Sequence, residues 1–273
     1  MTKRITAMLP NRPDGTQRTP RIVPELAAGR TTHAVWHNNL GGLTFQLGEG
    51  ETREFLKWLP HGSGVDLDEE IRRLQWAIRY AAVPRVLKQG ADDEGSWFVS
   101  AGLPGTSAVD DRWRQQPATA VRELGAGLRA LHDALPVDDC PFDWSAGSRL
   151  ARVRAAAAAG TLQPVEAHKL DENLSIDMLL ERLADIPPVD KLVVCQGDAC
   201  SPNTLIGDDG RWSAHVDLGA LGVADRWADL AVATWSTEWN YGPNWSEPLL
   251  EAYGVAPDWD RISYYRLLWA YAD

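Results

Sequence analysis

The stretch Val194-Cys195-Gln196-Gly197-Asp198-Ala199-Cys200-Ser201-Pro202-Asn203, followed by His215-Val216-Asp217-Leu218-Gly219, is the most informative part of this chain. Asn203 follows Asp198 by five residues, and Asp217 follows Asp198 by nineteen. Asp217 also stands between apolar residues and close to a glycine. Carboxylate and amide oxygens are hard donors, which Mg²⁺ prefers. The pattern therefore predicts a site that handles a metal ion.

The spacing of these three residues is the one by which kinase-type catalytic loops work. In such loops the first Asp orients a substrate hydroxyl, while the Asn and the second Asp hold Mg²⁺ on ATP. Phosphoryl transfer asks the protein mainly to position the hydroxyl and to neutralise phosphate charge. We therefore predict Asp198 as the catalytic carboxylate, and Asn203 and Asp217 as the metal ligands.

Length and composition favour a globular protein with two lobes. The chain has 273 residues and a mass of 30.1 kDa. Of its residues 44% are hydrophobic and 24% are charged, and both fractions are ordinary for a globular protein. No apolar run approaches the roughly 20 residues that span a bilayer, and the first residues lack a secretory signal, so we expect a cytoplasmic protein without a membrane partner. The three cysteines, Cys140, Cys195 and Cys200, do not describe a disulfide framework and are expected to be buried free thiols.

The net charge of −11 argues against a nucleic-acid partner, because proteins that bind phosphate backbones concentrate Lys and Arg. A small cationic substrate is the natural inference. The alternative, that an acidic surface merely keeps the protein soluble, stays open on charge alone.

The first hundred residues are predicted to form a five-stranded sheet with one helix. Residues 1–24 show no periodicity and are expected to be a leader. Residues 38–42 carry a turn signal between two strand-like runs, and residues 66–80 have helical spacing with acids in the first turn. The predicted strands are residues 34–36, 43–47, 54–59, 84–87 and 97–100.

After Pro104-Gly105 the pattern changes to helices. Strand-like runs at 192–195 and 214–216 bracket the turn signal Asp208-Asp209-Gly210, which predicts a hairpin there. The chain thus divides into a leader (1–24), a nucleotide-binding lobe with its hinge (25–103) and a helical lobe with the catalytic loop and substrate cleft (104–273). The predicted helices are residues 118–135, 150–159, 177–184, 229–235 and 262–271.

Four separated motifs together resemble the bacterial aminoglycoside O-phosphotransferases, nearest the 3′-type that modify kanamycin and neomycin. The resemblance runs from about residue 26 to the end. It implies an α+β, protein-kinase-like bilobal fold: a small five-stranded antiparallel N-lobe with one helix, and a larger, mainly helical C-lobe, with Mg-ATP (or Mg-GTP) between them. The motifs are Cys140-Pro141-Phe142, Gly197-Asp198-Ala199-Cys200-Ser201-Pro202-Asn203, the run from Asp217 to Arg226, and Tyr265-Arg266-Leu267-Leu268.

The resemblance also implies a nucleotide site. Lys57 stands mid-strand between apolar neighbours, where a charge is costly without partners. In the family this lysine touches the α- and β-phosphates, and its partner would be Glu70 on the following helix. The alternatives are an exposed edge-strand lysine and an ordinary acid in a helix's first turn.

Two further segments complete the expected nucleotide site. Gly29 and Thr31 fall where the family has its phosphate-covering loop, although one glycine is weak evidence. The stretch from Ser100 to Gly105 resembles the hinge between the lobes, where backbone groups of Ala101 and Leu103 would meet the adenine edge.

For the acceptor, the resemblance points to acidic residues that meet ammonium groups. Asp171 and Glu172 stand at one such place, and Glu238 is a further candidate. Tryptophan is unusually frequent, at 13 residues against 4 Phe and 6 Tyr, and Trp235 in the substrate cleft could stack on a sugar ring. The alternatives are that Asp171 and Glu172 merely begin a helix and that Trp235 packs in the core.

Two departures from the family pattern bear on function. Gln196 replaces the usual His two residues before the catalytic Asp; its amide can hydrogen-bond backbone but cannot titrate near neutral pH. Ala220 stands where relatives have Arg. The departures predict that the substrate pocket has been rebuilt relative to the family. Gln196 is the one hint of a non-catalytic nucleotide-binding relative.

The sequence thus predicts ATP-dependent phosphorylation of an aminoglycoside hydroxyl, nearest the 3′-hydroxyl, which would confer antibiotic resistance. The alternative is a kinase of another small hydroxylated antibiotic or metabolite, such as streptomycin, a macrolide or an amino sugar. The expected partners are the aminoglycoside and the nucleotide, with the protein a monomer or weak dimer.

Overall fold

The computed structural model describes residues 18–38, 40–162 and 174–272. Its N-lobe is built on a five-stranded antiparallel sheet in the order β1-β2-β3-β5-β4. The predicted five-stranded sheet is therefore confirmed. Its strands are β1 (Thr32–His37), β2 (Leu43–Leu47), β3 (Glu54–Pro60), β4 (Val86–Ala91) and β5 (Gly95–Ala101), with a 3₁₀ turn η1 (Gly50–Thr52) before β3.

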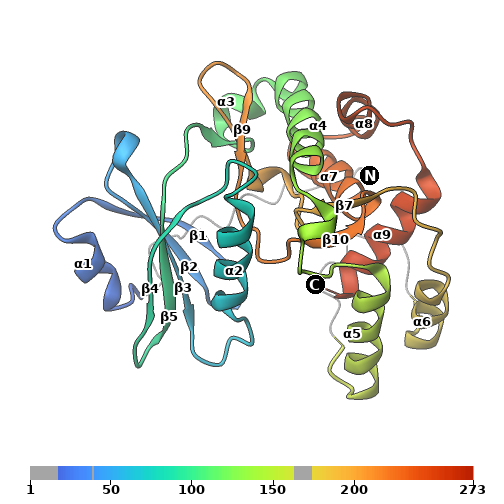
Figure 1. Cartoon of the computed structure of the whole chain (residues 1–273), viewed down its shortest axis with the longest axis horizontal. Helices are drawn as coiled ribbons and strands as arrows, with labels where there is room; N and C mark the ends of the chain where they lie inside the picture. The colour runs from blue at the N-terminus through green and yellow to red at the C-terminus, as the bar shows by residue number, and fades with distance from the viewer. Residues whose placement is uncertain (1–17, 39, 163–173, 273) are drawn as a thin grey trace, which may run out of the picture.

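Two helices cover opposite faces of this sheet (Figure 1). Because side chains alternate along a strand, Leu56 and Trp58 of β3 pack with α1 (Ile22–Ala27), while Leu59 packs with α2 (Leu67–Ala77). Lys57 is consequently directed to the face of α2 and the C-lobe. The helix α1 was not foreseen, because its six residues are too few to show a helical period.

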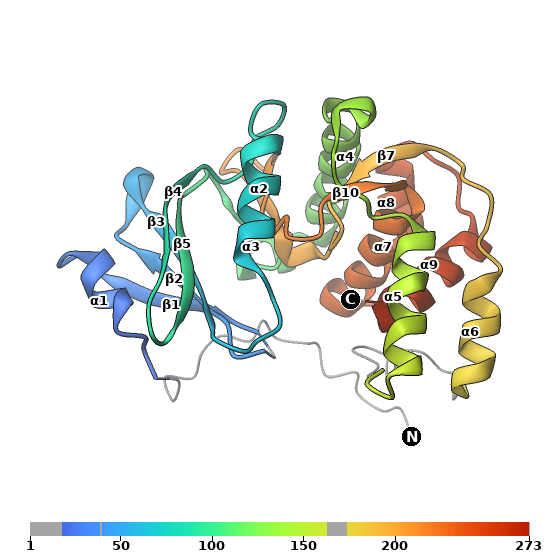
Figure 2. The ribbon, with the colours of Figure 1, turned by 60° about the horizontal axis from the view of Figure 1, so that its bottom comes forward.

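The C-lobe is mainly helical, as expected. Helix α7 lies at its centre, with residues 227–237 all buried, and it packs against α4, α8 and α9. Figure 2 shows α5 and α6 beside α9, away from the sheet. The helices are α3 (Asp111–Arg114), α4 (Pro117–Ala134), α5 (Ala146–Ala158), α6 (Ile176–Ala184), α7 (Trp227–Tyr241), α8 (Ser246–Tyr253) and α9 (Trp259–Ala272), with 3₁₀ turns η2 (Val137–Asp139) and η4 (Ser201–Asn203).

Short strands of the C-lobe frame the catalytic segments. Strand β7 (Leu192–Cys195) pairs with β10 (Gly222–Asp225), and a three-stranded sheet has the order β6-β8-β9. The predicted turn at 208–210 exists, but it joins β9 (Trp212–His215) to β8 (Thr204–Ile206) and not to β7. Strand β8 escaped prediction because it has three residues; β6 (Thr106–Ser107) has two. The catalytic loop therefore lies between β7 and β8.

A hydrophobic cluster joins the two lobes. Ile71 and Leu74 of α2 pack with Val194 of β7 and with Leu218, which follows Asp217. Across the described part of the chain, every helix is too short or too polar to cross a bilayer. Cys140, Cys195 and Cys200 form no disulfide bond, as predicted, but of the three only Cys195 is buried, whereas Cys140 and Cys200 are partly exposed.

Candidate active site

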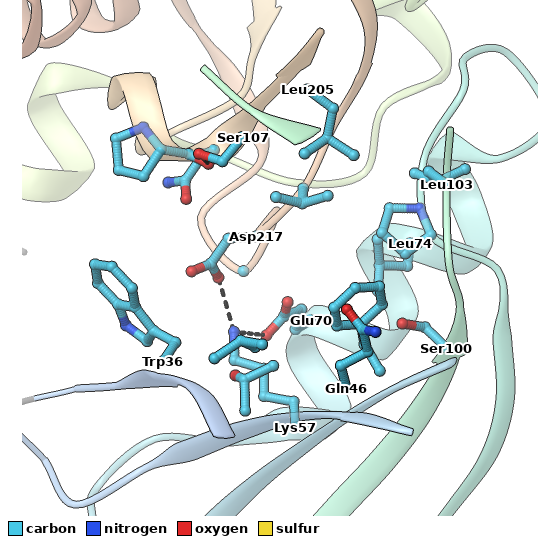
Figure 3. Close-up of a pocket in the computed structure, with 18 of the residues that line it drawn as sticks. Trp36, Gln46, Lys57, Glu70, Leu74, Ser100, Leu103, Ser107, Leu205 and Asp217 are labelled. Atoms are coloured by element: carbon cyan, nitrogen blue, oxygen red, sulfur yellow. Dashed lines mark hydrogen bonds and ion pairs between the residues drawn. The ribbon is translucent and has the colours of Figure 1, made fainter. Parts of the chain in front are cut away.

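A cavity of about 870 Å³ lies between the lobes, and both lobes line it. Figure 3 shows its charged centre, where Lys57 lies between Glu70 and Asp217. The structure thus brings together residues that are widely separated in the sequence. The predicted site residues among those that line the cavity are Lys57, Glu70, Ala101, Leu103, Asp198, Asn203 and Asp217.

Lys57 is held by two carboxylates from different elements. Its Nζ lies 2.6 Å from Glu70 Oε2 and 2.7 Å from Asp217 Oδ1. Burial by itself lowers the pKa of Lys57, but Asp217 and Glu70 outweigh burial and raise it above its ordinary value. Burial raises the pKa of Glu70, and Lys57 offsets part of that rise. The predicted Lys57–Glu70 pair is confirmed, and Lys57 stays charged at neutral pH.

Glu70 reaches Lys57 because α2 begins where it does. Asp66 caps the helix, its Oδ1 accepting a hydrogen bond of 2.9 Å from the Asp68 backbone. Such a cap satisfies one of the free N–H groups of the first turn. Glu70 then lies in that first turn, facing the sheet, and is 6% exposed.

Asp198 is positioned by its own loop. Its backbone N–H donates to Gln196 Oε1 at 2.7 Å, and Asn203 Nδ2 donates to Asp198 O at 2.9 Å and to Asp198 Oδ2 at 3.0 Å. Gly197, at φ 93°, is required, because a Cβ there would meet Ala220 O at 2.3 Å. Burial, with help from the Asp217 charge, raises the pKa of Asp198 to about 6, although hydrogen bonds from Cys200 and Asn203 pull it down.

Gln196 ties the catalytic loop to the Asp217 segment. It is fully buried, and its Nε2 donates to Val216 O and Asp217 O, each at 3.0 Å. Its Oε1 accepts from Asp198, as described above. The amide thus satisfies backbone groups on both segments, as the sequence suggested it could. This position has a structural task that needs no titratable group.

Asp229, at the start of α7, is the main residue that sequence reasoning missed. Its Oδ2 accepts from Gln196 N at 2.6 Å and its Oδ1 accepts from Gly197 N at 2.9 Å. Asp229 Oδ2 also lies 2.9 Å from Nε2 of the buried His132, whose Nδ1 lies 2.9 Å from the Tyr253 hydroxyl. An acid inside an otherwise apolar helical run was the signal that could have found it, because buried charges need partners.

Asn203 and Asp217 fit a magnesium ion by the chemistry of their donors. Because Asn203 Nδ2 donates to Asp198, the other end of the amide, Asn203 Oδ1, points away from Asp198. Asp217, at φ 58°, is exposed, and one of its oxygens faces Lys57. Two hard oxygen donors at one cavity wall suit Mg²⁺, which keeps several waters and binds through few protein ligands.

Some backbone N–H and C=O groups of the hinge are already hydrogen-bonded within the protein, and others remain for a ligand. Ala101 N–H is already donated to Arg85 O at 2.9 Å, and Gly102 N–H to Arg53 O at 2.9 Å. The Arg53 guanidinium donates to Leu103 O, and to Gly105 O at 3.2 Å. Of the two predicted contacts, Ala101 can therefore offer its carbonyl and Leu103 its N–H.

The expected place of the phosphate-covering loop is wrong. Gly29 and Thr31 precede β1 and do not line the cavity; Thr31 O accepts from Gly48 N, at the end of the hairpin away from its turn. The first strand begins at Thr32 and runs to His37. The connection between β1 and β2 is therefore residues 38–42, of which Asn38 and Gly42 line the cavity.

The predicted acceptor residues fare differently. Trp235 is 5% exposed, packed against Trp239, Trp269 and Arg266, so almost no ring surface is left for a sugar. Trp235 is therefore a core residue, because α7 is buried on all sides. Glu238 accepts from Ser246 Oγ at 2.6 Å and lies 3.5 Å from Arg266 Nη2, outside the cavity lining. Asp171 and Glu172 lie outside the described residues.

The site and the two-lobed architecture define a class of phosphotransferase, and comparison with known proteins agrees. Residues 38–265 match the model of a phosphotransferase enzyme family. The chain belongs to this family, and its fold is the protein-kinase-like bilobal fold.

Among relatives, an aminoglycoside 3′-phosphotransferase of Streptomyces fradiae is 36% identical over 86% of this chain and 93% of its own length. A streptomycin 3″-kinase of Streptomyces griseus is 32% identical over 89% of this chain and 93% of its own length. A solved aminoglycoside 3′-phosphotransferase of type VIII aligns with a TM-score of 0.74 at 30% identity, covering 88% of this chain and 93% of that one.

A further solved relative carries ligands. An aminoglycoside phosphotransferase of Streptomyces rimosus, in complex with ADP and streptomycin, aligns with a TM-score of 0.65 at 26% identity, covering 85% of this chain and 92% of that one.

Proposed function

We propose that this protein transfers the γ-phosphoryl group of ATP to a hydroxyl of an aminoglycoside, at the 3′-position, and so confers resistance to the antibiotic. The observation that carries the proposal is the meeting of Asp198, Asn203, Asp217, Lys57 and Glu70 in one cavity between the lobes. The 36% identity to an aminoglycoside 3′-phosphotransferase supports the substrate class and position.

Each residue has a task in this reaction. Bound Mg-ATP supplies the phosphoryl group, with Asn203 and Asp217 as the metal's protein ligands and Lys57 beside the phosphates. Asp198 accepts a hydrogen bond from the acceptor hydroxyl and orients its oxygen toward the phosphorus. Ala101 O and Leu103 N–H meet the amino group and N1 of adenine, which is why ATP is proposed over GTP.

The acceptor is proposed to be a polycation. The cavity lining contains more acids than bases, among them Asp66, Asp110 and Asp208 besides the catalytic set. Asp171 and Glu172 are proposed to meet the ammonium groups, so replacing them by Asn and Gln should raise the KM for the aminoglycoside about tenfold and leave the KM for ATP unchanged. An unchanged KM for the aminoglycoside would show that Asp171 and Glu172 do not bind the acceptor and would favour the alternative that they begin a helix.

The direct test is a coupled ADP-release assay over kanamycin, neomycin, streptomycin and a macrolide, with Asp198→Ala as the matched inactive control. Phosphorus–proton NMR of the product then locates the modified hydroxyl. Turnover with kanamycin and neomycin at the 3′-hydroxyl is expected. Turnover with streptomycin alone would instead favour the activity named for the Streptomyces griseus relative.

Cellular location and assembly are part of the proposal. The reaction consumes ATP, so we propose that the protein acts in the cytoplasm, as a monomer or weak dimer. Size-exclusion chromatography with light scattering checks the assembly, since a stable oligomer would elute at a multiple of 30.1 kDa.

A further inference from the structure

A β-bulge in the first strand turns two consecutive side chains into the cavity. Ala34 pairs with Phe45, but the next pair is Trp36 with Thr44, so Val35 is an extra residue on β1. In a regular strand neighbouring side chains point to opposite faces. Here Val35 and Trp36 both line the cavity. Bulges next to active sites commonly re-aim a side chain in this way.

Trp36 lies at the end of the cavity opposite the hinge. Figure 3 shows its indole on the far side of Lys57 from Ser100 and Leu103. The hinge is the place proposed for the purine, and Lys57 with Asp217 marks the phosphates. The space beside Trp36 therefore lies beyond the phosphates, where the acceptor hydroxyl must approach.

Other aromatic rings in the cavity lining are less suited to meet an acceptor. Phe98 is 3% and Trp58 9% exposed, and Phe55 pairs with Ser100 at the hinge end. Trp36 is half-buried, so part of its ring can meet a ligand. In the C-terminal cluster, where the sequence led us to expect stacking, Trp235 is buried, and Trp239 and Trp269 pack with it outside the cavity lining.

The charge around Trp36 suits a cationic ring. In the described lining the basic residues are Arg53, which donates to hinge carbonyls, and Lys57, which is held by two carboxylates. The acids Asp198 and Asp217 line the same cavity from the C-lobe. An aromatic face in a cavity with carboxylates binds an alkylammonium group by cation–π and Coulomb attraction together.

We propose that Trp36 is a specificity residue for the acceptor, its indole face packing against an aminosugar ring and that ring's ammonium group. This inference rests on the proposed function. It assigns acceptor recognition to the N-lobe hairpin as well as to the C-lobe. The lobe proposed to bind the nucleotide would then also contact the acceptor.

The test compares binding of two ligands to four variants. Calorimetric dissociation constants are measured for neomycin, in the presence of Mg-ADP, and for ADP alone. The variants are Trp36→Ala, Trp36→Leu, Trp36→Phe and the control His37→Ala, whose residue follows Trp36 in β1 but does not line the cavity.

We expect Trp36→Ala and Trp36→Leu to weaken neomycin binding about tenfold, Trp36→Phe to recover most of it, and ADP binding to stay within about twofold throughout. Trp36→Leu keeps apolar bulk and covers the case in which the alanine variant does not fold. The His37→Ala control should bind both ligands like the wild type.

Three results would overturn the inference. Neomycin binding that survives in Trp36→Leu would show that no aromatic face is needed. A loss of ADP affinity as large as the loss of neomycin affinity would place Trp36 over the phosphates. A wild-type protein that binds ADP but none of neomycin, kanamycin and streptomycin would remove both the inference and the proposed function, whereas the first two results leave that function standing.

Discussion

The two halves of the active site are held in place by different means. Asp198 is positioned inside one lobe, by Gln196, Asn203 and Asp229, through hydrogen bonds of 2.6 to 3.0 Å. The charged centre is instead shared between lobes, because Lys57 and Glu70 come from the N-lobe and Asp217 from the C-lobe. The first half is preorganised by the C-lobe core, while the second depends on how the lobes meet.

Helix α2 is the element on which that meeting depends. Besides carrying Glu70, it holds Arg73, whose Nε donates to Leu221 O at 2.9 Å and whose guanidinium lies 4.8 Å from the Phe142 ring centre. Together with the interlobe packing of Ile71 and Leu74, these contacts attach α2 to the segment that follows Asp217. Because α2 is attached to the C-lobe in this way, it holds Glu70 in place within the charged centre.

The largest effect is expected in the preorganised half. Asp198→Ala should lower kcat by about a thousandfold or more, because Asp198 is the group proposed to orient the acceptor hydroxyl. ADP affinity, measured by calorimetry, should stay within about threefold, since Asp198 is assigned to neither the nucleotide nor the metal. Wild-type turnover in this variant would show that the catalytic-loop assignment is wrong.

A change in the shared half should act through the metal. Asp217→Asn replaces a carboxylate ligand by a neutral donor and removes one of the two partners of Lys57, so both kcat and Mg-ATP affinity should fall, by about tenfold to a hundredfold. Titration of activity with Mg²⁺ at fixed ATP is the measurement. A Mg²⁺ dependence identical to that of the wild type would remove Asp217 from the metal site.

Gln196 connects the two halves, so its replacement tests whether they act independently. Gln196→Ala leaves Val216 O, Asp217 O and the Asp198 N–H without their partner and should lower the free energy of unfolding by about 2 kcal/mol. Turnover should fall about tenfold as the loop loosens. Gln196→His, which restores the usual residue of the family, should lose less. Denaturant unfolding and kcat measure both, and equal losses in the two variants would contradict this role.

The smallest effect concerns the cost of burying Asp198. Folding raises its pKa from 3.8 to about 6, so its contribution to stability is full below pH 3.8 and is lost as pH rises through about 6. Asp198→Asn removes this pH-dependent loss of stability, because an asparagine side chain does not ionise. Without metal or nucleotide, the variant's melting temperature relative to the wild type should therefore be higher at pH 8 than at pH 4.5. A difference that does not change with pH would contradict the raised pKa.

The candidate catalytic residues could be named from the sequence because kinase-type chemistry needs particular residue types at short, fixed separations. One loop and one hairpin separate Asp198, Asn203 and Asp217. Lys57 could be recognised as a charged residue within an apolar strand. The periodic segments were likewise predictable: α2 and α4 carry a helical hydrophobic period, and β2 alternates apolar and polar residues.

The acceptor end was not readable in the same way. Trp235 and Trp36 are the same residue type, and nothing local distinguishes a buried tryptophan from one that lines a cavity. Trp235 is enclosed because α7 is surrounded by other helices, and Trp36 faces the cavity because one extra residue in β1 shifts the pairing with β2. Asp229 was missed for a related reason, since its hydrogen-bond partners lie more than thirty residues away.

The sequence by itself predicted the fold class, the phosphotransferase chemistry and a set of candidate residues for it, because spacing and periodicity are local properties. Only the tertiary structure decided which loop of the N-lobe hairpin lines the cavity, which acid holds the loop that carries Asp198 and which tryptophan lines the cavity. The physical reason is that burial and strand register arise from contacts between distant segments, whose outcome is fixed by the packing of the whole chain.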